Sequence, residues 1–300
     1  MQNENTKAGV AVIVGLPNVG KSTLLNSIIG EKLSIVTPKP QTTRKKVLGI
    51  YSTEEEQIVF IDTPGHIKPR YELHRSMVQS IEDSLQETDV VLVLTDVNEY
   101  DKHEQVFSDT FMSLLKHCGK PLILAINKID LVRDKKTLLP IILEISKLEL
   151  FDEIIPISAI KKISLDELLK VITKYLPDSP FLYDPEYLSI QNERFFVSEI
   201  IRENIFKLFG EEIPFSTEVA IAEFKERENG KWHIAADIII ERDSQKKIII
   251  GEKGIKIKTL GEQSRIAIEQ HLNLPVFLTL FVKVRQKWRN NKNMLKSFGY

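Results

Sequence analysis

Residues 8–22 read Ala-Gly-Val-Ala-Val-Ile-Val-Gly-Leu-Pro-Asn-Val-Gly-Lys-Ser, and this stretch decides the fold of the first part of the chain. An apolar strand runs straight into a glycine-bearing loop, and a helix is expected from Lys21 to Ile29. The loop from Gly15 to Ser22 matches the phosphate-loop pattern G-x-x-x-x-G-K-[ST]. Glycines let backbone amides curl round phosphate groups, and the N-terminus of the following helix adds a partial positive charge. The stretch therefore predicts a nucleotide-binding α/β domain.

Strands and helices alternate through the rest of the first 177 residues. Four apolar, β-branched runs without polar alternation indicate buried parallel strands at 57–61, 90–94, 122–126 and 154–157. Helical patterns separate them at about 73–87, 103–117, 138–148 and 165–176. This βαβ rhythm predicts a doubly wound, mostly parallel sheet for residues 8–177.

The order of elements changes after a stretch that contains Pro177, Pro180 and Pro185. Such a stretch is typical of a linker, placed here at 178–191. Beyond it we expect a helix (193–209), two strands (218–225 and 232–241), a glycine turn, a helix (256–271) and a strand (276–284). This α-β-β-α-β order predicts a second, smaller α+β domain for residues 192–300, which ends in a basic tail.

The phosphate loop has an expected role for each polar group. Lys21 should reach the β- and γ-phosphates, and the Ser22 hydroxyl should bind Mg²⁺. The expected nucleotide-binding residues here are Gly15, Leu16, Pro17, Asn18, Val19, Gly20, Lys21, Ser22 and Thr23. The loop alone does not separate an ATPase, a kinase and a GTPase.

Asn127-Lys128-Ile129-Asp130 follows the strand that ends at Ile126 and indicates guanine. An Asp130 carboxylate accepts from both N1–H and the exocyclic amine of guanine, whereas adenine would leave the carboxylate unpaired. Ser158 and Ala159 follow the strand ending at Ile157, and their loop is suited to holding the guanine O6 with backbone amides. The expected nucleotide is therefore GTP or GDP.

Asp62-Thr63-Pro64-Gly65 follows the strand that ends at Ile61. Asp62 should hold Mg²⁺ through water, and the Gly65 amide should sense the γ-phosphate. Upstream, Pro40-Gln-Thr-Thr-Arg44 lies in a polar loop suited to a switch that orders around Mg²⁺. The sequence leaves open which of Thr42 and Thr43 binds the metal.

A short G-x-x-G stretch, Gly251-Glu252-Lys253-Gly254, precedes the expected helix of the second domain. Glycines at such a turn allow the close approach of a nucleic-acid backbone. Its expected RNA-binding residues are Lys246, Lys247, Gly251, Glu252, Lys253, Gly254, Lys256 and Lys258. With this loop, the α-β-β-α-β order resembles a KH domain of type II. Ile255, Ile257, Leu260, Ile266 and Ile268 are expected in the core or the wall of a groove.

Charge is distributed unevenly in the chain, whose net charge is −1. Residues 242–300 hold 13 Lys and Arg against 4 Asp and Glu, while the remainder carries a net charge of −10. A basic block in an acidic chain favours an anionic partner. The polar N-terminus, the lack of an apolar run of ~20 residues and the single cysteine, Cys118, favour a reducing, cytosolic compartment.

Taken with P-Q-T-T-R, D-T-P-G, N-K-I-D and S-A, the phosphate loop and the KH-like part resemble the bacterial Era GTPases over residues 8–290. The resemblance implies a monomeric cytoplasmic GTPase that binds the 3′ end of 16S ribosomal RNA, assists assembly of the 30S subunit and associates peripherally with the inner membrane. It also implies that Asn18 binds K⁺, which would take the place of an arginine finger.

His66 departs from the Era pattern, in which an apolar residue usually follows D-T-P-G. Its imidazole either orients the attacking water, or swings away and leaves that task to the backbone and the metal. The residues expected to act in hydrolysis are Lys21, Thr42, Thr43, Gly65 and His66.

Two other readings of the residues stay open at this point. One is a small-molecule kinase that uses the same phosphate loop, although the guanine-specific Asp130 disfavours it. The other is an RNA-binding scaffold with a vestigial nucleotide site, although the site residues that would be lost by decay are intact: Lys21, Ser22, Asp62 and Asp130.

Overall fold

The computed structural model describes residues 6–97, 108–226 and 231–300. They form two compact units, the second of which consists mainly of Gln191–Tyr300. The short segments Ile35–Thr42 and Arg70–Leu73 also belong to the second unit. Among the described residues, no helix combines the length and the apolar character needed to span a bilayer.

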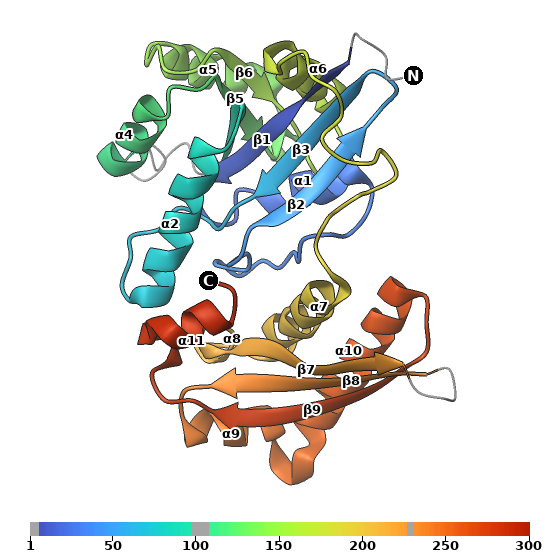
Figure 1. Ribbon diagram of the computed structural model, residues 1–300. Helices are drawn as coiled ribbons and strands as arrows, with labels where there is room; N and C mark the ends of the chain where they lie inside the picture. The colour runs from blue at the N-terminus through green and yellow to red at the C-terminus, as the bar shows by residue number, and fades with distance from the viewer. Residues whose placement is uncertain (1–5, 98–107, 227–230) are drawn as a thin grey trace. The chain divides into compact units, whose positions relative to one another are not determined.

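The first unit is built on a six-stranded sheet (Figure 1). Its strands are β1 (Lys7–Gly15), β2 (Val47–Ser52), β3 (Glu56–Asp62), β4 (Val90–Asp96), β5 (Leu122–Asn127) and β6 (Glu153–Pro156). Their order is β2-β3-β1-β4-β5-β6, and every pairing is parallel except that of β2 with β3. The carboxyl ends of the parallel strands therefore meet along one edge, where α/β proteins bind ligands.

Helices cover both faces of this sheet because its central strands are apolar on both sides. The helices are α1 (Lys21–Ile29), α2 (Glu72–Gln86), α4 (Asp109–His117), α5 (Leu138–Ser146) and α6 (Leu165–Tyr175). One buried cluster joins strands β1, β3, β4 and β5 to α2, α4 and α5. Helices α1 and α6 pack on the opposite face, against β1, β2 and β3. The doubly wound α/β fold expected from the sequence is confirmed.

The stretch expected as a linker lies along the first unit. The Gln57 carboxamide oxygen accepts from the amides of Leu182 and Tyr183 at 2.8 and 2.9 Å, and its nitrogen donates to the Tyr183 carbonyl at 2.9 Å. The Ile50 amide also donates to the Leu188 carbonyl at 2.8 Å. Backbone groups of the stretch thus form hydrogen bonds with residues of β2 and β3.

The second unit is an α+β domain around a three-stranded sheet. Its elements are α7 (Glu193–Leu208), α8 (Ile213–Ser216), β7 (Glu218–Glu226), β8 (Trp232–Ile240), α9 (Asp243–Ile250), α10 (Ile255–Leu272), β9 (Val276–Val284) and α11 (Lys292–Ser297). Strand β8 pairs antiparallel with β7 and parallel with β9. Apolar residues of α7, α9 and α10 and of all three strands form one buried core. The arrangement confirms the expected KH-type domain.

Most expected elements lie within two residues of the observed ones, but several elements were not expected. Strand β2 was not expected because Gly49 weakens its strand pattern. A Cβ atom at Gly49 would lie 2.7 Å from Leu25 of α1, so the close packing of this helix explains the glycine. Helix α9 contains the run Ile248–Ile250, which suggests a strand by composition. The basic tail contains α11, and Trp288 is buried beside it. Of the helix expected at 103–117, residues 103–107 lie outside the described residues.

Candidate functional site: a nucleotide site and a basic glycine loop

The phosphate loop joins the end of β1 to α1 at the carboxyl edge of the sheet. Gly20 adopts φ 102°, which favours glycine, and precedes the first turn of α1. The Lys21 ammonium lies inside the loop and donates to the carbonyls of Gly15 and Leu16 at 3.2 and 2.9 Å. Burial lowers the pKa of Lys21 to about 8, although the nearby Asp62 carboxylate opposes this shift. An anion in the loop would stabilise the charged form of this lysine and raise its pKa again.

Glycine at two positions of the site allows close approach. A Cβ atom on Gly20 would lie 2.4 Å from Nδ2 of Asn127, and one on Gly65 would lie 2.8 Å from the backbone nitrogen of Pro17. The phosphate loop therefore packs directly against the two loops that follow β5 and β3. The Asn127 side chain reinforces this contact, because Nδ2 donates to the Val19 carbonyl at 2.8 Å.

The base-binding loops meet beside the phosphate loop. Asn127 Oδ1 accepts from the Ala159 amide at 2.9 Å, and the Ser158 hydroxyl donates to the Asp130 carboxylate at 2.5 Å. Lys128 donates to the Asn18 carbonyl at 2.8 Å. Asn127 and Lys128 thus bond the phosphate loop to a segment more than a hundred residues further along the chain.

Sequence reasoning missed Asp96 at the end of β4. Its buried carboxylate pairs with the Lys128 ammonium at 2.5 Å and holds that lysine between the phosphate loop and the base-binding loop. The signal available in the sequence was an acidic residue two positions after the apolar run 90–94, at the carboxyl end of the strand that borders the site.

An oxygen-rich cluster lies next to the phosphate loop. Ser22 donates to Asp62 Oδ2 at 2.6 Å, and its hydroxyl lies 2.8 Å from the hydroxyl of Thr43. Ser34 also donates to Asp62 Oδ2, at 2.9 Å, and it was missed because no motif includes it. Burial raises the pKa of the Asp62 carboxyl, while Lys21 and the surrounding hydroxyls oppose the shift.

The chemistry of this cluster fits Mg²⁺, which prefers carboxylate and hydroxyl oxygens. The second carboxylate oxygen, Asp62 Oδ1, is buried and accepts no hydrogen bond from the described residues. A buried acceptor without a donor is costly, and a bound cation with its waters would satisfy it.

The two threonines of the expected switch differ in their surroundings. Thr43 faces Ser22, as described above, whereas the Thr42 hydroxyl lies 2.7 Å from that of Thr37 and donates to the Lys39 carbonyl at 2.7 Å. Thr43 is therefore grouped with the Asp62 cluster, and Thr42 is bonded within its own loop.

His66 lies at the edge of the same site. Its amide donates to the Gly15 carbonyl at 3.0 Å, and its ring packs on Phe111 with centroids 4.7 Å apart. Burial, with a smaller effect of Lys21, lowers the pKa of His66, so the imidazole is neutral at pH 7. Beside it, the Thr63 hydroxyl donates to the Ile13 carbonyl at 2.7 Å and fixes the loop. Leu16, Pro17, Val19, Thr23 and Pro64 lie in the same loops or in α1.

In the second unit, the G-x-x-G loop joins α9 to α10. Gly251, Lys253 and Gly254 all have positive φ, at 73°, 49° and 78°. A Cβ atom on Gly251 would lie 2.7 Å from Lys256, whereas nothing lies within 4 Å of one on Gly254. The loop around Gly254 is thus open to a ligand, directly before the N-terminus of an 18-residue helix.

The lysines near this loop are mostly exposed. Lys247, Lys253, Lys256 and Lys258 are exposed, and Lys246 is half-buried. The more distal basic residues are partly neutralised, since Lys283 pairs with Asp237 at 2.6 Å and Arg289 pairs with Glu241. Arg285 and Lys287 are exposed, and Lys258 pairs with Glu262 at 4.0 Å, so the positive charge is shared between the G-x-x-G loop and the tail.

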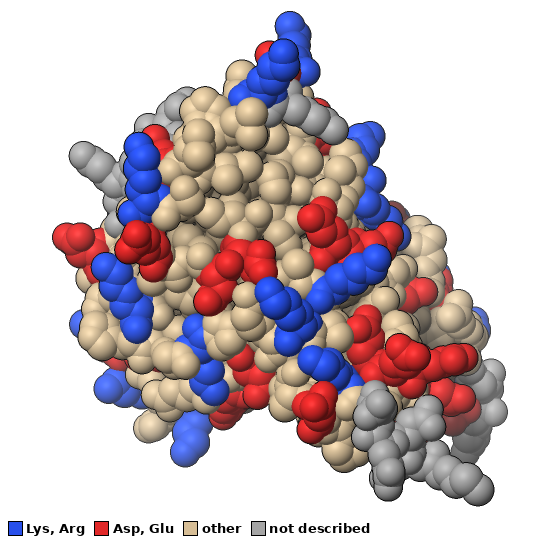
Figure 2. Space-filling model, turned by 90° about the horizontal axis from the view of Figure 1, so that it is seen from above, with Lys and Arg blue, Asp and Glu red and all other residues tan. Residues whose placement is uncertain are grey.

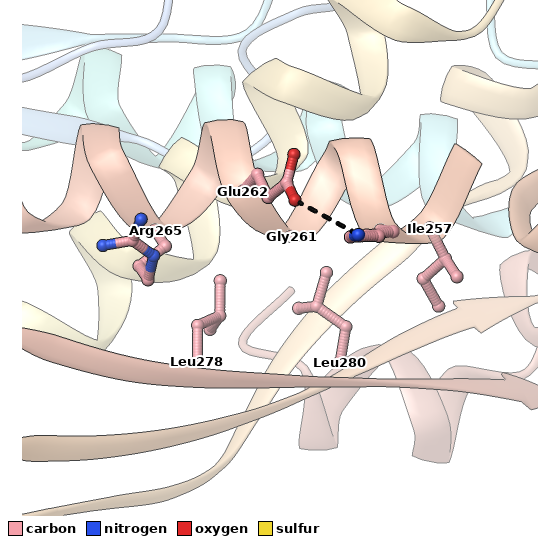
Figure 3. Close-up of a pocket in the computed structure, with 7 residues that line it drawn as sticks. Ile257, Gly261, Glu262, Arg265, Leu278 and Leu280 are labelled. Carbon is pink, nitrogen blue, oxygen red and sulfur yellow. Dashed lines mark ion pairs between the residues drawn. The ribbon is translucent and has the colours of Figure 1, made fainter. Parts of the chain in front are cut away.

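A groove of about 340 Å³ runs between α10 and β9, next to that loop (Figure 3). Its wall includes Ile257, as expected, while Leu260 and Ile268 are in the core. Ile255 and Ile266 lie neither in the core nor in the groove wall, because their side chains are 62% and 50% exposed. The reason is the 3.6-residue period of α10, which turns them away from the sheet.

Comparisons with known proteins agree with both units. Residues 10–128 match the model of the 50S ribosome-binding GTPase family, and residues 212–289 match that of the KH domain. The chain is 42% identical over 300 residues to the GTPase Era of Lactobacillus helveticus (strain DPC 4571), covering 100% of this chain and 98% of that protein. It is also 42% identical to the GTPase Era of Geotalea daltonii, over the full length of both.

Two solved structures are similar over nearly the whole length. One is a variant of Aquifex aeolicus Era bound to GDP·AlF4⁻, with a TM-score of 0.94, 41% identity and coverage of 98% of this chain and 99% of that one. The other is Era in complex with MgGDPNP and nucleotides 1506–1542 of 16S ribosomal RNA, with a TM-score of 0.93 and the same identity and coverage. From its sequence, its two units and the site at the phosphate loop, the chain belongs to the Era family of GTP-hydrolysing proteins.

Proposed function

We propose that this GTPase is a switch that binds the 3′ end of 16S ribosomal RNA through residues 192–300 and assists assembly of the 30S subunit. The observation that carries the proposal is that one chain joins a guanine nucleotide site to a basic G-x-x-G loop at a helix N-terminus. The Era structure with nucleotides 1506–1542 of 16S ribosomal RNA, 41% identical to this chain, supports the identity of the RNA.

In the nucleotide domain, residues 8–177, the residues described above would each bind a different part of the nucleotide. Lys21 and the amides of the phosphate loop hold the phosphates, and Asp130 with the Ser158–Ala159 loop holds the guanine. Ser22, Asp62 and Thr43 would hold Mg²⁺, either directly or through water, and we assign the switch ligand to Thr43 because its hydroxyl faces Ser22. The bound ion would supply positive charge to the phosphates.

Hydrolysis requires an oriented water and compensation of the charge that develops between the β- and γ-phosphates. A neutral His66 can accept a hydrogen bond from water, and the Gly65 amide would contact the γ-phosphate. For the charge, we propose K⁺ held by the side-chain oxygen of Asn18, an exposed residue at the tip of the phosphate loop. Replacing K⁺ by Na⁺ should then slow GTP hydrolysis in the unmodified protein and have little effect in Asn18→Ala; equal rates in both salts would remove K⁺ from the proposal.

On the RNA side, a phosphate would approach the Gly254 amide region while the exposed lysines provide long-range attraction. Binding by several lysines predicts a steep loss of affinity with salt, because each neutralised phosphate releases counterions. The bases of an unpaired strand would then lie along the α10–β9 groove.

A peripheral contact with the inner membrane is proposed as a second property, for a monomeric protein that is otherwise cytoplasmic. Helix α5 exposes Leu139 and Leu143, one turn apart, at 59% and 63%, and Leu131 is similarly exposed. Figure 2 looks onto this end of the first unit and shows uncharged surface between scattered charges of both signs. Sedimentation with anionic vesicles should fall in Leu139→Gln/Leu143→Gln; unchanged sedimentation would exclude α5 as the contact.

The main proposal is tested by measuring the affinity of the full chain for the 16S fragment 1506–1542 with GTP analogue, with GDP and without nucleotide. A switch predicts affinities that differ by about tenfold or more between nucleotide states, equal to about 1.4 kcal/mol of coupling. Equal affinities would refute the switch, and no binding in any state would refute the RNA partner. Accumulation of unassembled 30S precursors on depletion of the protein would test the role in assembly.

A further inference from the structure

Four large apolar side chains are exposed in the stretch between α6 and α7. They are between 43% and 54% exposed, and they are Leu182, Tyr187, Leu188 and Ile190. Single apolar residues scattered over a surface need no explanation, whereas a contiguous group of them is typical of an interaction site. The question is therefore whether these side chains lie together.

The attachment of the stretch to the sheet brings them together. Gln57, which lies opposite Ser52 in the β2–β3 ladder, accepts a hydrogen bond from the Leu182 amide at 2.8 Å. The Ile50 amide, two residues before Ser52 on the edge strand β2, donates to the Leu188 carbonyl at 2.8 Å. The two points of attachment are about 7 Å apart along the strand. The chain between them therefore leaves and rejoins the same part of the edge, and its apolar side chains form one patch.

The patch is bordered by negative charge. Five exposed carboxylates lie in the same stretch or in the turn between β2 and β3: Asp178, Asp184, Glu186, Glu54 and Glu55. Within residues 6–97, 108–226 and 231–300, none of these five forms an ion pair. The sequence holds no lysine or arginine in 47–62 or in 175–192.

Two neighbouring side chains are consistent with an unbalanced negative charge. Burial raises the pKa of the Tyr51 phenol on β2, and the carboxylates of Glu56 and Asp166 raise it further. Lys7 pairs with Asp178 through the backbone, but its ammonium donates to carbonyl groups at the end of α6. The surface thus combines exposed apolar side chains with carboxylates that lack a cation.

We propose that the patch of Leu182, Tyr187 and Leu188, with the carboxylates of Asp184 and Glu186, binds a basic protein segment in which arginine or lysine alternates with apolar residues. Charge complementarity selects this occupant, because RNA and anionic lipids carry phosphates that the carboxylates repel. Arginine pairs with carboxylates through two hydrogen bonds, and apolar side chains beside it cover the leucines. The surface shares no residue with the nucleotide site or the G-x-x-G loop, so this partner is additional to GTP and RNA.

The chemistry of the partner is tested with short labelled peptides and the full chain, by fluorescence anisotropy. A peptide of alternating arginine and leucine should bind about tenfold or more tightly than one of alternating arginine and serine, because only the first covers the apolar patch. A peptide of alternating glutamate and leucine should bind as weakly as the serine peptide or more weakly. Failure of the arginine–leucine peptide to bind, or equal binding of the glutamate–leucine peptide, would overturn the proposal.

A charge variant locates the binding. Asp184→Asn/Glu186→Gln should lower the affinity for the arginine–leucine peptide about tenfold, since two exposed ion pairs are lost. The turn is kept, because the Glu186 amide, which donates to Asp184 at 3.0 Å, finds the same acceptor on asparagine. Glu211→Gln/Glu212→Gln removes two exposed carboxylates of the second unit and should leave the affinity unchanged. Equal losses in the two double variants would mean that the peptide responds only to net charge, against the proposal.

Leu182→Ser/Leu188→Ser tests the apolar part and keeps every charge. It should lower the affinity for the arginine–leucine peptide about tenfold and leave GTP affinity unchanged, because both side chains are exposed and the bonds of the segment are made by the backbone. Other occupants have their own outcomes. If this variant lost affinity for the 16S fragment or for anionic vesicles but not for the peptide, or abolished a dimer of the unmodified chain, the basic segment would be the wrong partner.

Discussion

At the scale of single residues, the identity of the nucleotide depends on the Asp130 carboxylate. Asp130→Asn should lower GTP affinity roughly 30-fold, about 2 kcal/mol, because the amide presents a donor to the guanine N1–H or amine. Affinity for xanthosine triphosphate should rise, since its base carries a carbonyl in place of the amine. The bond from Ser158 survives, because the asparagine oxygen still accepts it.

Titration of both nucleotides by fluorescence or calorimetry measures this exchange. Asp134→Asn is a matched control that removes the same charge four residues away, on the exposed side of the loop. An Asp130→Asn variant that bound GTP normally would contradict the assignment of the guanine contact.

A second residue-scale prediction concerns Glu269 and pH. Glu269 accepts from the Val276 amide at 2.9 Å and from Arg265 at 2.6 Å, so it ties α10 to the start of β9. The Val276 amide holds the pKa of Glu269 below its usual range, with a smaller contribution from Arg265. A carboxyl whose pKa falls on folding stabilises the protein above its unfolded pKa, and this stability is lost as the pH falls through the folded pKa.

Glu269→Gln should therefore lower the free energy of unfolding by about 1 kcal/mol at pH 7. The difference from the unmodified protein should shrink as the pH falls from the ordinary pKa of a glutamate, about 4.3, through the lower folded pKa of Glu269, because its carboxyl then becomes neutral. Urea denaturation at neutral pH and at about pH 3.5 measures it. A difference that did not change with pH would mean that packing, not charge, accounts for the role of this residue.

At the scale of elements, the turn between α9 and α10 combines an open position with a backbone that favours glycine. Gly254→Asp should weaken RNA binding about tenfold or more without affecting GTP affinity, because a carboxylate would stand where a phosphate approaches. Gly254→Asn is the matched control, since asparagine also tolerates the φ of 78° but carries no charge.

Filter binding of the 16S fragment, with circular dichroism to check folding, compares the two variants. The asparagine variant should bind nearly as well as the unmodified protein. If the aspartate and asparagine variants bound equally well, the loop would not contact the phosphate chain.

At the scale of the whole molecule, each unit has a buried apolar core of its own. We therefore expect residues 191–300, expressed alone, to unfold cooperatively and to bind the 16S fragment. In the full chain, GDP at about a hundred times its dissociation constant should stabilise the first unit by about 2.7 kcal/mol and leave the midpoint of the second unchanged. Differential scanning calorimetry of the chain and of the fragment tests both points; a fragment without a cooperative transition would contradict them.

The sequence by itself determined the local parts of this protein. The phosphate loop, the N-K-I-D and D-T-P-G stretches and the G-x-x-G turn are contiguous, and their chemistry depends on neighbouring residues, so their spacing was enough to predict an α/β GTPase with a KH domain. The apolar strands were recognisable because both of their faces are buried.

Only the tertiary structure decided which distant groups meet. Asp96 belongs to the site because it ends a parallel strand at the same edge of the sheet. Ser34 belongs to it because its amide donates to Asn26 Oδ1 of α1 at 2.9 Å and its hydroxyl donates to Asp62, contacts that no local pattern reveals. The separation of Thr43 from Thr42 also depends on contacts across elements. The physical reason is that a side chain acts through the groups it faces, and those are chosen by packing rather than by position in the chain.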